Sequence, residues 1–165
     1  MSFMLSEPRI TWAPPVIDTP AGGGFTSYCR IGLTSTQSVA SGSVVKLNFD
    51  TVLYDNNSEW DTTDKRFIAK VEGCYHVSYQ LRITSLGSGK TVQGLLLKNG
   101  NTYSSTNWSA MSTTGDLSRG VAGSDDVCLN VDEYIEIAVY HNHGSNRDFA
   151  VNSYVENFVA IHRVA

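Results

Sequence analysis

The stretch Tyr75–Ile83 reads YHVSYQLRI, with a large apolar residue at every second position and polar residues between them. A period of two is typical of a strand that buries one face, so this stretch predicts a half-buried β-strand. Ile135–Val139 alternates in the same way, and Asn99-Gly100 predicts a type I′ hairpin turn because both residues tolerate positive φ. Further strands fit the stretches Ser27–Leu33, Ser43–Asn48, Thr91–Lys98, Asn101–Ser112, Asp126–Val131 and Ala150–Arg163. No segment sustains a helical period, so the sequence predicts an all-β sandwich of roughly nine or ten strands, most simply a jelly roll.

Length and composition indicate a single domain with one substantial core, since the chain has 165 residues of which 41% are hydrophobic. A net charge of −4 disfavours a nucleic-acid partner, and no apolar run reaches the roughly 18 residues of a membrane helix. The first residues lack the features of a secretory signal, so we expect a protein made in a reducing cytosol. Cys29, Cys74 and Cys128 are therefore expected to be free, mostly packed thiols.

All four prolines lie within the first 20 residues, which sets this segment apart from the rest of the chain. Proline lacks an N–H and fixes φ, so residues 1–24 are predicted to form an extended arm, able to reach ~80 Å when fully stretched. The arm carries many apolar residues and few charges, so we expect it to dock on a partner; the alternative is a frayed terminus. The anchoring residues that we expect are Phe3, Leu5, Ile10, Trp12, Val16 and Ile17.

A spacing of aromatic and turn residues in the first half of the body resembles the globular C1q domain, of the C1q/tumour necrosis factor-like group. The positions that carry the resemblance are Phe49, Asp55, Trp60, Phe67, Gly73, Tyr75 and Tyr79. Val77 departs from the pattern, because the family prefers Phe there. Leu95–Gly100 and Ser153–Phe158 resemble the central hairpin and the closing strand of the family, with Asn157 where Gly is common.

The resemblance covers residues 25–165 and implies a ten-stranded jelly roll that assembles as a tight homotrimer. In such trimers an aromatic face packs in the core or near the threefold axis. The residues of that face would be Phe49, Trp60, Phe67, Tyr75, Tyr79 and Phe158. No Gly-X-Y stalk is present, and the chain looks more like the C1q-like domains of bacteriophage and bacterial proteins than like secreted animal ones.

Two short motifs that suggest chemistry have simpler interpretations. His141-Asn142-His143 precedes a Gly-Ser-Asn turn and is read as the end of a strand, with a metal site at a trimer cleft as the alternative. Gly87–Thr91 ends like a phosphate-binding loop, but the first glycine and the following helix are missing, so a turn is expected.

Surface acids and aromatics leave two further readings open. Several acidic residues could contribute oxygens to a Ca²⁺ site, but solvated turns at strand ends are the preferred interpretation. No cofactor or metal is therefore expected. These acids are Asp116, Asp125, Asp126, Asp132 and Glu133. Tyr103 and Trp108 could stack on sugar rings, although alternation favours the core for both.

These observations predict a structural virion protein and not an enzyme, because no nucleophile signature appears. The body would form a homotrimer, and the arm would bind the major capsid protein or another virion lattice, as a capsid decoration or cement protein does. The alternative function is a trimeric knob that binds a host receptor or glycan. Neither nucleic acid nor membrane is an expected partner.

Overall fold

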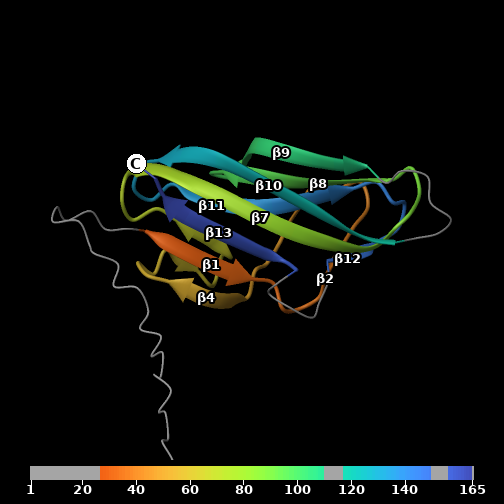
Figure 1. Ribbon diagram of the computed structural model, residues 1–165, viewed down its shortest axis with the longest axis horizontal. Coiled ribbons are helices and arrows are strands. Elements are labelled where there is room, and N and C mark those ends of the chain that lie inside the picture. Colours follow the sequence, from red (N-terminus) through yellow and green to blue (C-terminus); the bar gives the residue numbers. More distant parts are fainter. Residues whose placement is uncertain (1–26, 110–116, 150–155, 165) are drawn as a thin grey trace, which may run out of the picture.

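The computed structural model describes residues 27–109, 117–149 and 156–164, and the predicted arm lies outside them. All regular structure within these residues is β, and it forms two layers (Figure 1). No helix in the described part of the chain is long and apolar enough to span a membrane.

Two antiparallel sheets make up the fold. The strands are β1 Tyr28–Gly32, β2 Gln37–Val39, β3 Val45–Lys46, β4 Thr51–Asp55, β5 Trp60–Asp61, β6 Arg66–Ile68, β7 Gly73–Leu86, β8 Thr91–Lys98, β9 Asn101–Ser109, β10 Leu117–Leu129, β11 Tyr134–His141, β12 Arg147–Phe149 and β13 Phe158–Arg163. The seven-stranded sheet has the order β2-β12-β7-β13-β1-β4, and β10 pairs with β7. The six-stranded sheet has the order β5-β6-β11-β8-β9, and β3 pairs with β11.

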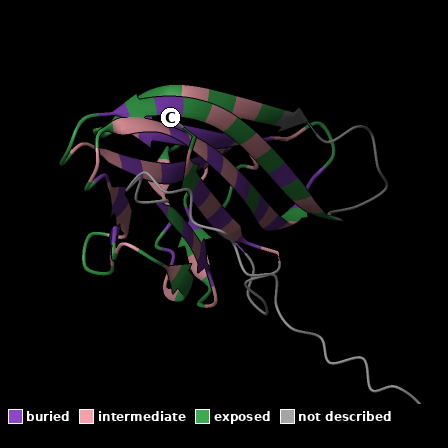
Figure 2. Ribbon diagram, turned by 60° about the vertical axis from the view of Figure 1, so that its left-hand side comes forward, coloured by how far each residue is buried: buried purple, intermediate pink, exposed green. Residues whose placement is uncertain are grey.

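The core lies between the two sheets and follows the alternation of the strands. Along β7, buried side chains occupy every second position and outward ones lie between them, as the banding of the strands in Figure 2 illustrates. Phe49 and Phe67 are fully buried, and each contributes roughly 1.5–3 kcal/mol relative to an exposed side chain. Only the inner face needs apolar residues, so the outward positions of each strand remain free to serve function.

Tyr79 of β7 packs so closely against two neighbouring strands that both need a glycine. A Cβ atom added at Gly94 of β8 would lie 2.5 Å from the Tyr79 ring. One added at Gly123 of β10 would lie 2.6 Å from the Tyr79 hydroxyl and 2.5 Å from that of Thr106. The two hydroxyls are themselves hydrogen bonded at 2.6 Å, so Tyr79 ties the seven-stranded sheet to β9.

The fold class predicted from the sequence, an all-β jelly roll, is confirmed, and so is the hairpin at Asn99-Gly100. Asn99 (φ 50°) and Gly100 (φ 77°) both occupy the left-handed region that a type I′ turn requires. The described residues contain thirteen strands instead of the ten that were expected, because several segments of two or three residues also pair. The strand expected at Asp126–Val131 is longer and begins at Leu117, where its glycines and serines pair with β7. The last strand begins at Phe158 within the described residues.

Candidate functional site

The outer face of the seven-stranded sheet is the candidate functional surface. β10, β7 and β13 lie side by side there (Figure 1). Their alternating burial shows that every second side chain points away from the core. The outward side chains near the centre are small, among them Ser78, Ala122 and Ser124, and they leave a shallow hollow of about 340 Å³. Its lining residues are Ser78, Tyr79, Gln80, Ala122, Gly123, Ser124 and Phe158. A broad, shallow surface of this kind suits a macromolecular partner better than an enclosed small molecule.

Charged and aromatic side chains border this hollow on the β13 side. The Arg30 guanidinium carbon lies 3.6 Å from the centre of the Phe158 ring, a cation–π contact. Arg82 forms an ion pair with Glu156. Asn157, at the position where the resemblance leads one to expect glycine, is fully buried. Its side-chain oxygen accepts a hydrogen bond of 2.6 Å from the backbone N–H of Arg82.

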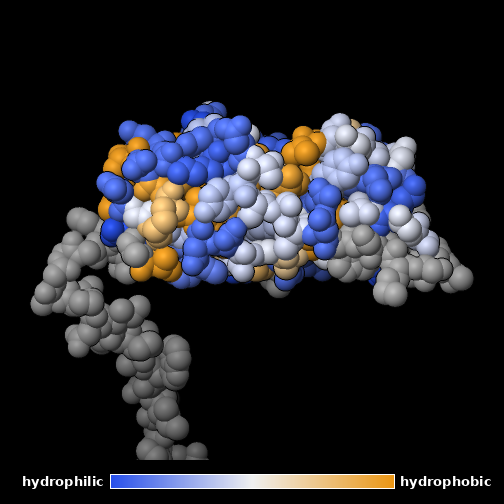
Figure 3. All heavy atoms as spheres, turned by 90° about the horizontal axis from the view of Figure 1, so that it is seen from above, coloured by the Kyte–Doolittle hydropathy of each residue, from blue (hydrophilic) through white to orange (hydrophobic). Residues whose placement is uncertain are grey.

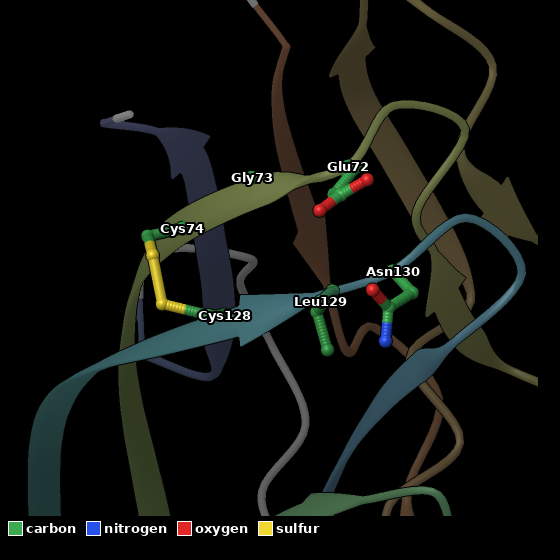
Figure 4. Close-up of a pocket in the computed structure, with 6 residues that line it drawn as sticks. All are labelled: Glu72, Gly73, Cys74, Cys128, Leu129 and Asn130. Carbon is green, nitrogen blue, oxygen red and sulfur yellow. A yellow bond between two sulfur atoms is a disulfide. The ribbon is translucent and has the colours of Figure 1, made fainter.

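A disulfide joins Cys74 of β7 to Cys128 of β10, which corrects the expectation that all three cysteines are free (Figure 4). The two residues are direct partners in the strand register, with Cα atoms 3.9 Å apart, and the sequence alone does not show this register. Cys29 is the one free cysteine and is buried, as predicted. Burial raises the pKa of the Cys29 thiol, and the carboxylates of Asp55 and Glu59 raise it further, so this thiol is protonated and unreactive at neutral pH.

A small pocket of about 210 Å³ lies beside the disulfide. Its lining residues are Glu72, Gly73, Cys74, Cys128, Leu129 and Asn130 (Figure 4). Among the acidic groups near this end of the sheet, Glu133 stabilises its own turn through hydrogen bonds. The hydrogen bonds from Lys98 and from the Asn130 N–H lower the pKa of Glu133 to about 2.

The aromatic set expected at the core or the trimer axis divides into two groups. Phe49, Trp60, Phe67, Tyr75 and Tyr79 are all buried between the sheets. Phe158 alone is half-buried on the outer face, beneath Arg30. Of this set, only Phe158 is therefore placed to meet a neighbouring chain directly.

Among the tyrosines that the structure describes, Tyr28, Tyr54 and Tyr103 are exposed. Tyr103 is 48% exposed and donates a hydrogen bond of 3.1 Å to the Asp126 carbonyl oxygen, so the expectation that it belongs to the core was wrong. It lies on β9, the edge strand of its sheet, and its ring remains at the surface. The side chain of Trp108 lies outside the part of the structure that is described. Tyr28 and Tyr54 are also exposed, and their rings meet edge to face with centroids 5.7 Å apart.

The two short motifs both serve the fold. β11 ends at His141, which confirms the strand-end reading. His141 is fully buried and its Nε2 donates to the Val39 carbonyl oxygen at 3.0 Å, while His143 Nδ1 accepts the Gly87 N–H at 3.2 Å. Gly87–Thr91 is the turn between β7 and β8, and a strand follows it, so the phosphate-loop interpretation is excluded.

The acids considered for Ca²⁺ are spread over separate elements. Asp125 and Asp126 lie on β10, Asp132 occupies a turn with φ 69°, and Asp116 lies outside the described residues. No three His, Cys, Asp or Glu side chains converge as a metal-ligand set within 27–109, 117–149 and 156–164.

Asp50 is a structural carboxylate that the sequence did not single out. Its Oδ1 accepts the Thr34 N–H at 2.8 Å and the Thr34 hydroxyl at 2.9 Å, and its Oδ2 accepts the Ser35 N–H at 2.8 Å. Partial burial alone would raise the pKa of Asp50, but the hydrogen bonds from Ser35 and Thr34 outweigh it and lower the pKa to about 2. Asp50 thus fixes the loop between β1 and β2 against the start of β4.

Curated proteins similar to this chain belong to bacterial genomes. The chain is 30% identical over 122 residues to the "Phage-like element PBSX protein XkdV" of Bacillus subtilis (strain 168), which covers 71% of the chain and 18% of that protein. It is 25% identical over 126 residues to the uncharacterized protein YqcC of the same strain, which covers 74% of the chain and 34% of that protein. The chain therefore spans only a minor part of each relative.

Solved structures share the architecture at low identity. Murine APRIL at pH 5.0 matches with a TM-score of 0.66 and 11% identity, over 84% of this chain and 99% of that one. The globular domain of the zebrafish complement 1qA protein matches with a TM-score of 0.62 and 14% identity, over 85% of this chain and 98% of that one. At these identities the likeness establishes the fold alone. The family model described as the C1q domain matches residues 31–150, well over half of the sequence. The chain therefore belongs to the C1q domain family.

Proposed function

We propose that this chain is a homotrimeric structural protein of a bacteriophage-type particle, without a catalytic role. The observation that carries the proposal is the match of most of the chain to a protein of a phage-like element, together with its place in the C1q family. Domains of the C1q/tumour necrosis factor-like group typically bind or assemble and do not catalyse. The body would comprise residues 25–165, and the particle would be its location.

The outer face of the seven-stranded sheet supports self-assembly. The small side chains around Ser78 and Ala122 leave room for the surface of a neighbouring subunit, and Phe158 offers an apolar contact at the rim. Figure 3, which views the molecule from above, shows a largely polar surface on which apolar side chains form only separate groups. Association through the sheet face would leave the loops free for other contacts.

The arm, residues 1–24, would anchor the trimer on a lattice formed by the major capsid protein or by another virion protein. Each apolar arm side chain that becomes buried contributes roughly 1.5–3 kcal/mol. Three arms on one rigid trimer act together, because the first contact raises the effective concentration of the other two. Modest anchors can in this way hold a capsid decoration or cement protein almost irreversibly, as a particle under internal pressure requires.

The test uses the full chain and point variants of the arm. The double variant Trp12→Ser/Ile17→Ser is compared with a control that also carries two substitutions in the arm, Ser6→Ala/Thr11→Ala. The assay is co-sedimentation with particles that lack this protein. Mass photometry records the oligomeric state of both. We expect trimers throughout and particle binding only by the unchanged chain and the control. Binding by the Trp12/Ile17 variant would place the contact on the body, and a monomer would contradict the assembly.

A receptor- or glycan-binding knob is the second candidate, and the exposed tyrosines favour it. Tyr28 and Tyr54 form a paired aromatic surface, and Tyr103 lies exposed on β9. Aromatic rings of this kind stack on sugar faces. The discriminating measurement is a glycan array probed with the full chain and with Tyr54→Ala, with the exposed Val52→Ala on the same strand as the control. Glycan signals that Tyr54→Ala abolishes and Val52→Ala retains would favour the knob over the cement role.

A further inference from the structure

Asp126, His76 and His162 form a row across three adjacent strands of the outer sheet face. In the antiparallel register, His76 of β7 is the direct partner of Asp126 on β10. On its other side, His76 is the direct partner of His162 on β13. Direct cross-strand partners on one face hold their Cβ atoms about 4.5–5.5 Å apart. Residues separated by tens of positions in the sequence are thus brought into line.

The separation of the two imidazole rings matches that of two histidines on one metal ion. Their centroids lie 5.3 Å apart, with the ring planes inclined at 48°. A Zn–N bond of about 2.1 Å, extended by about 1.1 Å from nitrogen to ring centre, places each centroid about 3.2 Å from the ion. At a tetrahedral angle, two such rings have centroids about 5.2 Å apart. The observed spacing of the two rings therefore fits two histidines on one ion.

Asp126 supplies the outer partner that metal-binding histidines commonly have. One of its carboxylate oxygens lies 2.7 Å from His76 Nδ1, so Nδ1 donates to Asp126 and Nε2 keeps its lone pair. A carboxylate in this position fixes the ring and makes Nε2 a better ligand. His76 and His162 then provide two ligands, and water would complete the coordination shell. Both residues are accessible to solvent: His76 is partly buried and His162 is exposed.

We propose that His76 and His162 bind one divalent transition-metal ion of the Zn²⁺, Ni²⁺ and Cu²⁺ class, with Asp126 positioning His76. Imidazole is the side chain that these ions prefer, and neither Ca²⁺ nor Mg²⁺ would bind a pair of neutral nitrogens. The ion would link β7 to β13 on the face where the disulfide links β7 to β10. Every ligand belongs to one chain, so the site does not depend on the particle role; it does require that this end of the sheet face, beside the disulfide, stays outside the contact between subunits.

The test measures binding of Zn²⁺ alone to the full chain, prepared without a polyhistidine tag, by calorimetry and by metal analysis after dialysis. We expect one ion per chain. His76→Gln or His162→Gln should remove the chelate and weaken binding by far more than tenfold, and Asp126→Asn should weaken it about tenfold. Gln80→Ala, an exposed outward position on the same strand, is the matched control and should bind like the unchanged chain.

A second measurement does not depend on variants folding. The electron paramagnetic resonance spectrum of Cu²⁺ bound to the unchanged chain should carry the hyperfine pattern of two imidazole nitrogens. Three results would each overturn the proposal: no Zn²⁺ binding, binding by the His76 or His162 variant as strong as that of the unchanged chain, or a one-nitrogen spectrum. One ion per three chains would also overturn it, because the ligands would then surround an axis between chains. Circular dichroism of each variant confirms that the fold is retained.

Discussion

Gly123→Ala is the substitution whose cost the structure defines best. An added Cβ would lie 2.6 Å from the Tyr79 hydroxyl and 2.5 Å from the Thr106 hydroxyl, which are themselves hydrogen bonded. Overpacking of this kind costs about 1–3 kcal/mol. Gly120→Ala on the same strand is the matched control, because its Cβ would meet only the Leu81 carbonyl oxygen, at 3.7 Å. By restricting the unfolded chain, this control should be neutral or stabilising by about 0.4–1 kcal/mol.

Thermal unfolding followed by circular dichroism tests the difference. At about 2–4 °C per kcal/mol for a chain of this size, Gly123→Ala should lower the melting temperature by about 2–12 °C, and Gly120→Ala should not. All samples are held at one protein concentration, since assembly makes the midpoint concentration-dependent. In a Tyr79→Phe background the penalty at Gly123 should shrink by at least about 0.5 kcal/mol, because one of the two obstructing hydroxyls is gone and Thr106 loses the partner that holds its hydroxyl in place. Equal melting temperatures for the two alanine variants would refute the packing argument.

The remaining predictions concern the cysteines and one carboxylate. Reduction of the Cys74–Cys128 disulfide should lower the free energy of unfolding by up to about 4 kcal/mol. This is the loss of chain entropy expected for a loop closed over 54 residues. Urea titrations with and without a phosphine reductant measure the difference. A thiol reagent should modify no cysteine in the folded chain and only Cys29 in urea without reductant; three modified thiols in urea alone would contradict the disulfide. Because the pKa of Asp50 is lowered from 3.8 to about 2, its contribution to stability should be complete above about pH 4 and disappear as the pH falls through 2. Asp50→Asn should remove that part of the pH dependence, and an unchanged profile would show that the loop does not need the charge.

Local signals explain which parts of the fold were predictable. The alternation in β7 and the Asn99-Gly100 turn each depend only on residues close together in the sequence. The strand and the hairpin could therefore be predicted without knowing which strands they pair with. β8 was predicted with the bounds that the structure has. The first half of β10 was missed because LSRG and AGS alternate poorly, and its strand conformation depends on pairing with β7. Propensity alone cannot reveal a strand that a neighbour stabilises.

The disulfide was missed for a related reason. Cys74 and Cys128 each lie one position from a buried residue, Tyr75 and Val127, so in the structure both lie on the outer face of the sheet and not among the packed side chains that were expected. Only the register of β7 and β10 reveals that they are opposite one another. The expectation of free thiols rested on the absence of a secretory signal, and an argument about compartment does not determine which side chains are in contact.

The candidate metal site shows the same dependence on register more sharply. His141-Asn142-His143 attracted attention because its histidines are close in sequence, yet both support the fold through hydrogen bonds. His76 and His162 attracted none, because 86 positions separate them and each looks like an ordinary outward residue of a strand. Proximity in the sequence is a weak guide in a sheet whose paired strands come from distant parts of the chain.

The inner and outer faces of the two sheets have different roles, and binding depends on the outer ones. Murine APRIL reaches the same architecture with 11% identity, so very different inner faces can fill the space between the two sheets. An inner face that tolerates such change cannot specify a partner. Outward positions carry no packing requirement, and they are where this chain places its histidine row, its exposed tyrosines and its disulfide. Apart from the two disulfide cysteines, variants that alter outward residues should therefore change binding while leaving the unfolding temperature almost unchanged. Inner-face variants should lower the unfolding temperature and affect binding only through loss of fold.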